Sequence, residues 1–201
     1  MSRSRLLLIA IVVLLAALWL RTPRHIRHSP GELVPEIPRQ EPVDRPLPPL
    51  QKGDIRIRPL AKFSLSARVL SRADYSWDKE SQLAPVDLAL GWGRMSDSAV
   101  LDKVEISQSS RFYHWHVQAF PIPESEIVES SANMHLAPAD AAVEREIRRT
   151  RAGDVVVFDG YLVEAVWPDG YRWVSSLTRS DSGSGACELV WVEHFSIEPR
   201  P

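Results

Sequence analysis

The sequence predicts an α+β domain that consists mostly of β-strands, arranged as an antiparallel meander or small barrel with one helix. Three observations predict this class. Short segments of alternating polar and apolar residues recur along residues 60–198, Gly-containing turns separate several of them, and one segment has helical periodicity. Three strands, a helix and at least two more strands follow one another, which is also the order of an OB-type barrel.

The first part of the domain contains three expected strands. "FSLSARV", from Phe63, alternates apolar and polar residues, and "KVEISQ" and "RFYHWHVQAF" predict two strands joined by a short Ser-Ser connection. The stretch from Asp74 to Met95 shows no such alternation and is expected to be irregular. Within it, Pro85 is expected to start a single helical turn over residues 86–90.

The remainder of the domain is expected to contain the helix and four further strands. Pro138 lies at an early helical position, Val143 and Ile147 share one face, and Gly153 ends the helix. Glu144 and Arg148 are expected to form an i,i+4 ion pair on this helix. Turns at 159–160, 168–170 and the "SDSGSG" loop then separate "DVVVF", "YLVEAVW", "YRWVSSL" and "ACELVWVEHF". In such a meander, residues 171–177 pair with residues 186–193.

An apolar run from Leu6 to Leu20 lies between arginines at the N-terminus. It is shorter than the about 20 residues of a typical membrane span, but no small-residue cleavage site follows it. We therefore expect residues 1–21 to be an uncleaved signal anchor that contacts the lipid bilayer through residues 6–20, with a cleaved signal peptide as the alternative. A long domain after a single anchor is usually exported. The expected location is the bacterial inner membrane, with the domain in the periplasm.

Residues 22–59 contain nine of the 16 prolines and are expected to form an extended proline-rich linker before a globular domain at 60–198. A docking site for a proline-reading module is the alternative. The net charge is +5 for residues 1–59 and −7 for residues 60–201. An acidic domain argues against nucleic acid as a partner.

Two groups of residues invite a chemical interpretation. His114 and His116 lie on one side of an expected strand and could both bind a metal ion, but they are on its polar side and no third ligand is identifiable. Neither a metal nor another cofactor is therefore predicted. Cys187, the only cysteine, could act as a nucleophile with His135 as its base and Asn133 as the orienting group. However, Cys187 alternates with Leu189 and Trp191, so its side chain is expected to face the core.

Polar and aromatic residues in the expected loops are the candidate ligand contacts: Trp77, Asp87, Trp92, Asn133, His135, Arg179 and Asp181. The order of turns in a meander predicts that His135 and Asn133 approach Arg179 and Asp181. These side chains would form a polar cluster at one end of the sheet, with Cys187 buried beneath it.

The segments "APVDLALGWG", "SANMHLAPAD" and "SLTRSDSGSGACE" together resemble an uncharacterised family of bacterial proteins with an N-terminal membrane segment. The resemblance covers roughly Phe63 to Phe195 and implies an envelope location without implying an activity. The expected function is that of a single-pass, membrane-anchored envelope protein whose extracytoplasmic domain binds a protein partner or small ligand. The alternative is a thiol-dependent hydrolase or transferase that uses Cys187 and His135.

Overall fold

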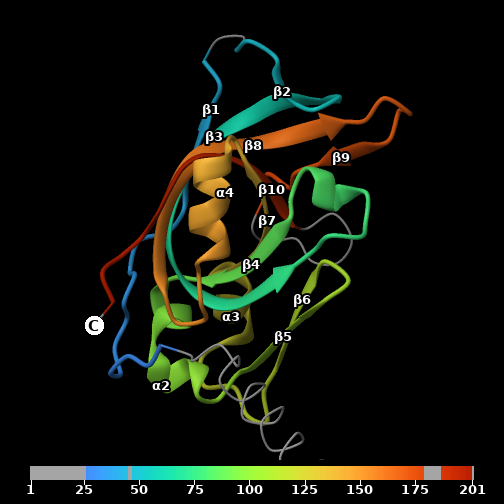
Figure 1. Cartoon of the computed structure of the whole chain (residues 1–201). Coiled ribbons are helices and arrows are strands. Elements are labelled where there is room, and N and C mark those ends of the chain that lie inside the picture. The colour runs from blue at the N-terminus through green and yellow to red at the C-terminus, as the bar shows by residue number, and fades with distance from the viewer. Residues whose placement is uncertain (1–25, 45–46, 179–186, 201) are drawn as a thin grey trace, which may run out of the picture.

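The computed structural model describes residues 26–44, 47–178 and 187–200, and it is mostly β (Figure 1). The strands are β1 (Arg39–Pro42), β2 (Leu50–Lys52), β3 (Ile55–Asp74), β4 (Val86–Gly91), β5 (Glu105–Ser109), β6 (Phe112–His116), β7 (Ser131–Pro138), β8 (Val155–Val166), β9 (Arg172–Val174) and β10 (Glu188–Ile197). The helices are α2 (Ser98–Leu101), α3 (Glu124–Glu129) and α4 (Ala141–Arg148). The predicted class, α+β with mostly β, is confirmed, although two short helices join the one that was expected.

Five strands form a closed path of pairing. β3 pairs with β4, β4 with β7, β7 with β10, β10 with β8, and β8 pairs again with β3. The β7–β10 pair is parallel and the others are antiparallel. Helix α4 lies between the third and fourth of these ring strands in the chain. Of the three strands predicted before the helix, only the one at Phe63 belongs to the ring, because the other two form the separate β5–β6 sheet.

The main hydrophobic core contains inward-facing residues of all five ring strands, and α4 packs against it (Figure 1). Val143 and Ile147 of α4 are buried, and the Glu144–Arg148 ion pair forms as predicted. The predicted helix start was wrong, because Pro138 ends β7. The helix begins after Asp140, whose carboxylate accepts hydrogen bonds from the Ala142 and Val143 amides and so caps the first turn.

The expected turn at Asp159–Gly160 was wrong, because both residues lie within the single strand β8. Gly160 instead allows strands β8 and β10 to pack closely. A Cβ atom at this position would lie 1.9 Å from the backbone oxygen of Trp191 on β10. The glycine therefore lets β10 approach β8 at a bulge in their pairing.

The predicted pairing of residues 171–177 with 186–193 was also wrong. Strand β9 pairs with β8 alone, whereas β10 lies between β7 and β8. Because β10 lies between two other strands of the ring, residues on both of its faces are buried, with Val190 and Val192 on one face and Leu189 and Trp191 on the other. The turn at residues 168–170 does form as predicted, with Gly170 at φ +88° and its amide donating to the Trp167 carbonyl.

Residues 86–91 form strand β4 and not a helical turn. All six residues are buried, so the segment lacks the alternation that identifies a strand with one wet face. "SANMHLAP" was likewise expected to lead into the helix, but it is strand β7, also buried along nearly its whole length.

The proline-rich segment does not form a free spacer from residue 26 onward. Arg39–Pro42 pairs with Ala61–Ser64 of β3, Leu50–Lys52 pairs with Ile55–Ile57, and Val34 is buried in the main core. Pro42 is compatible with this packing because β1 is an edge strand, where a missing N–H costs no ladder hydrogen bond, and Pro59 lies in β3 at a bulge in its pairing with β8. Among the described residues, no helix has the length and apolar character needed to span a membrane. The expected anchor at residues 6–20 lies outside them.

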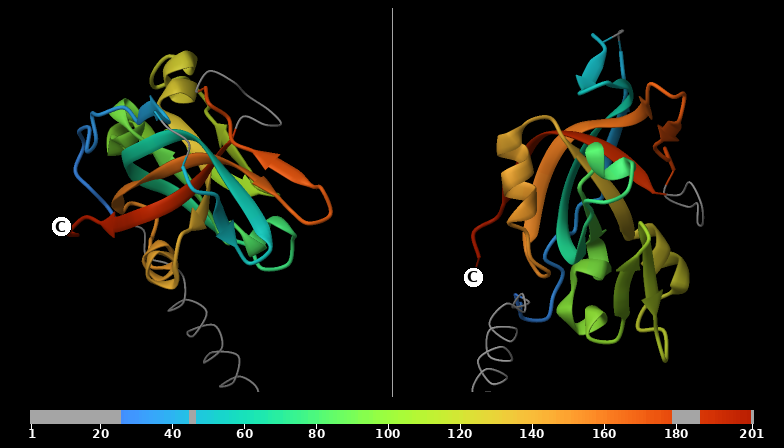
Figure 2. Two further views of the ribbon diagram at one scale, coloured as in Figure 1. Left: turned by 90° about the horizontal axis from the view of Figure 1, so that it is seen from above. Right: turned by 45° about the vertical axis from the view of Figure 1, so that its right-hand side comes forward.

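The β5–β6 hairpin forms a separate two-stranded sheet and packs with α2 and α3 against the outer side of the ring (Figure 2). Its position confirms the two strands predicted from Lys103 and Arg111. The connecting turn is Ser110–Arg111, one residue later than the expected Ser-Ser connection.

Candidate ligand-binding pocket

One pocket, which we call the aromatic pocket, lies outside the ring beside the polar face of β7. Its volume is about 500 Å³. Four separate parts of the chain form it: the segment after β3, the β5–β6 turn, the β9 hairpin, and the residue before β10. Its lining residues are Tyr75, Trp77, Asp78, Glu80, Ser110, Arg111, Phe112, Tyr171, Trp173, Val174 and Cys187.

The rim of the aromatic pocket holds an unusual share of the exposed apolar surface. Of the eight large hydrophobic side chains that are exposed in the described residues, four line this pocket. They are Trp77, which is 83% exposed, Phe112, Tyr171 and Val174. Exposed apolar groups gathered around a concave site mark a surface that binds a partner or ligand.

Arg111 forms the charged floor of the pocket. It follows Ser110 in a two-residue hairpin turn in which both residues have positive φ, 50° and 66°. Its guanidinium donates two hydrogen bonds to Asp78 (2.8 and 2.9 Å), one to Asp87 (2.9 Å) and one to the carbonyl of Ala84 (3.1 Å). It also lies 4.0 Å from the ring centre of Tyr75. These contacts satisfy most of its donors and fix the turn over the sheet.

Asp87 and His135 lie directly below Arg111 on neighbouring strands. They are register partners across the β4–β7 pair, so their side chains emerge side by side. Asp87 Oδ2 lies 2.9 Å from His135 Nδ1, at ion-pair distance but without the alignment of a hydrogen bond. The imidazole also packs against Trp173, with 4.7 Å between ring centres. Both polar side chains are almost fully buried.

Asn133 connects the floor to the thiol. Its Nδ2 donates to the Arg111 carbonyl at 3.0 Å and lies 4.0 Å from Cys187 Sγ, while its Oδ1 accepts from Gln108. Cys187 is only half-buried and lines the pocket, so the expectation of a thiol in the core was wrong. The reason is its position: Leu189 and Trp191 are buried within β10, whereas Cys187 precedes the strand and meets a polar residue of β7.

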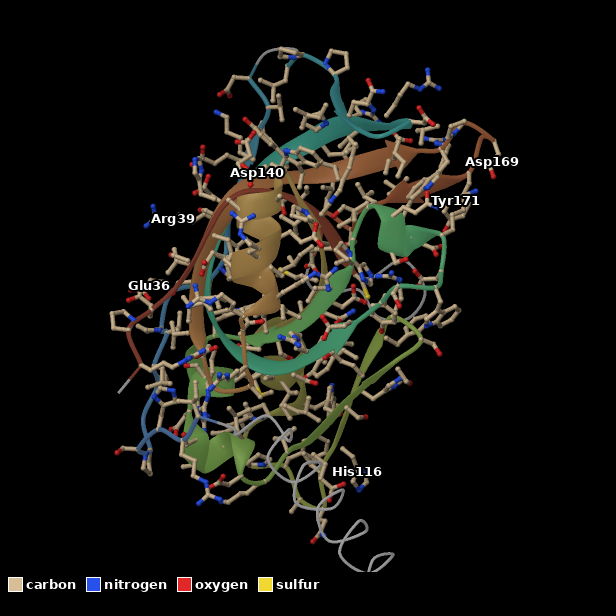
Figure 3. All side chains as sticks on the ribbon, viewed as in Figure 1. Glu36, Arg39, His116, Asp140, Asp169 and Tyr171 are labelled. Carbon is tan, nitrogen blue, oxygen red and sulfur yellow. The ribbon has the colours of Figure 1, made fainter. Side chains whose placement is uncertain are left out.

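Charged contacts join two segments of the rim. Lys79 pairs with Asp169 and lies 4.7 Å from the ring centre of Tyr171, and the Tyr171 hydroxyl donates to Glu80 at 2.6 Å. The bond to Glu80 raises the pKa of Tyr171 to about 12. Figure 3 shows Asp169 and Tyr171 at the tip of the β8–β9 hairpin. These contacts hold the hairpin against the segment after β3.

Opposing influences act on the ionisable groups of the floor. Burial raises the pKa of Asp78, but its bonds with Arg111 and Ser81 outweigh burial and leave this pKa below its usual value. Burial also raises the pKa of Tyr75. Asp78 is therefore a carboxylate and Tyr75 a neutral phenol at neutral pH.

The structure brings several predicted residues together and separates others. Trp77 lines the aromatic pocket, and Asp87, Asn133 and His135 lie in buried strands beneath it, not in loops as expected. Trp92 was a wrong choice as a ligand contact, because it is 1% exposed in the main core. Arg179 and Asp181 lie outside the described residues, so their predicted approach to His135 stays a prediction. His114 and His116 are on the exposed side of β6 and do not line this pocket, although the His114 ring lies 6.4 Å from that of Phe112, which does.

Sequence reasoning missed most of the pocket lining, including Tyr75, Asp78, Arg111, Tyr171 and Trp173. Only Arg111 could have been identified from the sequence. It is a charged residue in a short turn between two predicted strands, and a hairpin holds such a residue in a defined position. The aromatic residues gave no such signal, since their neighbours in the pocket come from distant parts of the chain.

No protein-family model matches the chain, and comparisons with curated proteins and with solved structures found no significant match.

Proposed function

We propose that the domain is a binding module that captures its ligand in the aromatic pocket without chemical turnover. The observation that carries this proposal is the gathering of four exposed apolar side chains around a charged floor in which Arg111 is hydrogen-bonded to Asp78, Asp87 and the Ala84 carbonyl. Such a floor is rigid, because Arg111 is held by two carboxylates and a carbonyl. Because the base of the pocket is already rigid, binding a ligand there costs less conformational entropy of the protein.

The chemistry of the lining favours a neutral ligand with flat apolar faces. Asp78 and Glu80 carry two negative charges against the one positive charge of Arg111, and Asp87 adds another negative charge beneath. An anionic ligand would meet net repulsion, and the donors of Arg111 are largely occupied. Trp77, Phe112 and Tyr171 instead offer exposed rings, which pack well against the apolar faces of sugar rings. We propose an uncharged oligosaccharide as the ligand class.

The place of the pocket on the ring supports the same proposal. OB-type domains bind oligonucleotides and oligosaccharides with the face of their second and third strands and with the loops after the first strand and before the fifth. The aromatic pocket lies over β4 and β7, the second and third ring strands, and uses the segments after β3 and before β10. The acidic charge of the domain favours the sugar over the nucleic acid. This support is an analogy of fold.

Calorimetric titration of the full chain in a non-ionic detergent tests the proposal. The probes are an uncharged N-acetylglucosamine tetramer and a sulfated tetrasaccharide of similar length. We expect the neutral probe to bind, and Trp77→Ala and Phe112→Ala each to weaken binding by about tenfold, the equivalent of one aromatic contact. Phe120→Ala is the matched control, because Phe120 is also exposed but lies outside the pocket. Preference for the sulfated probe, or equal effects of all three substitutions, would contradict the proposal.

We further propose that residues 1–21 anchor this module in the bacterial inner membrane with the domain on the periplasmic side. The apolar run at Leu6–Leu20 and the resemblance to bacterial proteins with an N-terminal membrane segment support this location. A C-terminal fusion to a reporter that is active only outside the cytoplasm tests it. Activity of a reporter that works only inside the cytoplasm would refute it.

A thiol-dependent hydrolase or transferase is the second candidate function, and the accessibility of Cys187 favours it. The thiol lines the aromatic pocket beside Asn133, while His135 contacts Asp87 on the same polar face. Maleimide labelling of the native chain separates the two candidates. A working nucleophile should be labelled within minutes and protected by a substrate, whereas a binding module should retain its oligosaccharide affinity after Cys187→Ser.

A further inference from the structure

A second pocket, which we call the Arg68 pocket, lies where the N-terminal segment packs on the domain. Its volume is about 480 Å³. Residues 26–28, strand β3, helix α2 and the loop before β8 form its walls, and Figure 1 shows the N-terminal segment passing beside α2. The lining residues are Ile26, Arg27, His28, Arg68, Val69, Leu70, Ser98, Leu101, Asp102, Val104, Ile106, Ala152 and Gly153.

Arg68 is a buried cation that the described part of the chain leaves without an ion-pair partner. The residue is 8% exposed, and its Nη1 donates to the Ser96 carbonyl and to Ser98 Oγ, both at 2.9 Å. No carboxylate of the described residues lies within ion-pair distance of it, and its Nε and Nη2 form no hydrogen bond there. Nearby Asp97 instead accepts bonds from the backbone amides of Gly31 and Ala99.

A buried charge that lacks a partner is costly, so Arg68 favours the arrival of an anion. Burial lowers the pKa of Arg68, and the charges of Asp102 and Asp97 offset this only in part. Guanidinium groups bind phosphate oxygens with two parallel hydrogen bonds, and Arg68 retains the donors for such a contact.

The ionisable groups of the lining sum to a net positive charge. Arg27 is exposed and forms no ion pair with the described residues, and Asp102 is the one acidic residue of the lining. His28 Nε2 lies 2.7 Å from the carbonyl of Gly153, which orients the ring at the wall. Two arginines against one aspartate make the Arg68 pocket cationic within an acidic domain.

The wall formed by residues 26–28 depends on Gly153. The amide of Ile26 donates to the Ala152 carbonyl at 3.0 Å. Gly153 has φ +94°, and a Cβ there would lie 2.1 Å from the backbone oxygen of Ile26. Glycine at this position therefore allows the N-terminal segment to dock and complete the pocket.

We infer that the Arg68 pocket binds a phosphate group through Arg68 and Arg27. An anionic lipid headgroup and a soluble phosphate both offer this chemistry. The lipid source rests on the proposed membrane anchor: Ile26 follows Leu20 by six positions, a reach of at most about 20 Å. The phosphate site itself does not depend on the oligosaccharide function, because the two pockets share no lining residue.

Thermal unfolding of the full chain in a non-ionic detergent tests the site, with inorganic phosphate compared with chloride at equal ionic strength. We expect phosphate to raise the unfolding temperature of the wild type, since a ligand that binds only the folded state stabilises it. Arg68→Gln and Arg27→Gln should each weaken phosphate binding by about tenfold or more, as loss of a charge-assisted hydrogen bond implies. Arg56→Gln is the matched control, because Arg56 is an exposed arginine of the same strand that lies outside the pocket.

Arg27→Gln keeps the test valid if Arg68→Gln fails to fold, because Arg27 is exposed. The same shift with phosphate in wild type and Arg27→Gln, or no shift in the wild type, would overturn the inference. Reconstitution in nanodiscs then identifies the source. An increase in unfolding temperature with phosphatidylglycerol over phosphatidylcholine that Arg27→Gln abolishes supports a lipid headgroup, and a response to inorganic phosphate alone supports a soluble ligand. Oligosaccharide binding that survives Arg27→Gln shows that the two pockets act independently.

Discussion

Replacement of Arg111 by methionine should destabilise the domain far more than replacement of an exposed arginine. The Asp87 side chain is fully buried and Arg111 is 12% exposed, so the substitution leaves a buried carboxylate without its counter-charge. Breaking a buried pair in this way costs about 3–5 kcal/mol, a large part of the about 5–15 kcal/mol that stabilises a typical domain. Arg149→Met is the control: its side chain is 71% exposed and pairs with Glu146 on a helix surface, so we expect at most about 1 kcal/mol.

A double-mutant cycle separates the ion pair from other effects of the substitution. Asp87→Asn removes the charge that Arg111→Met leaves uncompensated, so the double variant should be less destabilised than the sum of the single variants by about 1–3 kcal/mol. Urea unfolding of the full chain in non-ionic detergent, followed by tryptophan fluorescence, gives the free energies. Additive effects, or an Arg111→Met cost no larger than that of Arg149→Met, would refute the assignment of Arg111 as the buried charge that holds the floor together.

Three further experiments test the core, a partly buried tyrosine and the strand contact. Trp92→Ala should lower the free energy of unfolding by about 3–5 kcal/mol because the Trp92 side chain is in the core. Trp77→Ala should change the free energy of unfolding by at most about 0.5 kcal/mol, because Trp77 is exposed. Equal losses for the two variants in urea unfolding would be inconsistent with the difference in burial between the two side chains. Burial raises the pKa of Tyr113 to about 12, so the stability that this group contributes is complete below pH 10 and lost as the pH rises to about 12. Unfolding free energies measured across that range should fall less steeply for Tyr113→Phe, and an unchanged slope would argue against a raised pKa at Tyr113. Gly160→Ala should cost about 1–3 kcal/mol because its Cβ meets the Trp191 backbone oxygen, and an unchanged melting temperature would rule out that close approach.

The segments that the sequence predicted well are those with one wet face. The strand at Phe63, both strands of the β5–β6 hairpin and the face of α4 all show the period expected of half-buried elements. Strand β4 was missed because every residue in it is buried, which removes the alternation. Strands β1 and β2 were missed because proline content hides short edge strands.

The pairing of β10 with β7 joins segments that are far apart in the sequence. No pattern of neighbouring residues could therefore predict it. For the same reason the candidate site could be predicted only in part. Asn133, His135 and Cys187 were recognised by residue type, whereas Asp78 and Arg111 acquire their role when the hairpin turn lies over β4. The sequence separates these two residues by 33 positions. Their meeting is a property of the fold.

The indole N–H resonances of the seven tryptophans offer the most direct test of the aromatic pocket as a binding site. They are measured by NMR on the full chain in non-ionic detergent during titration with the uncharged N-acetylglucosamine tetramer, and single Trp→Phe variants assign them. The account predicts that the resonances of Trp77 and Trp173 shift with the probe concentration, since both side chains line the pocket. The resonances of Trp92 and Trp191, whose side chains are buried and do not line the pocket, should stay in place. Shifts at Trp92 or Trp191 without a shift at Trp77 would contradict the account.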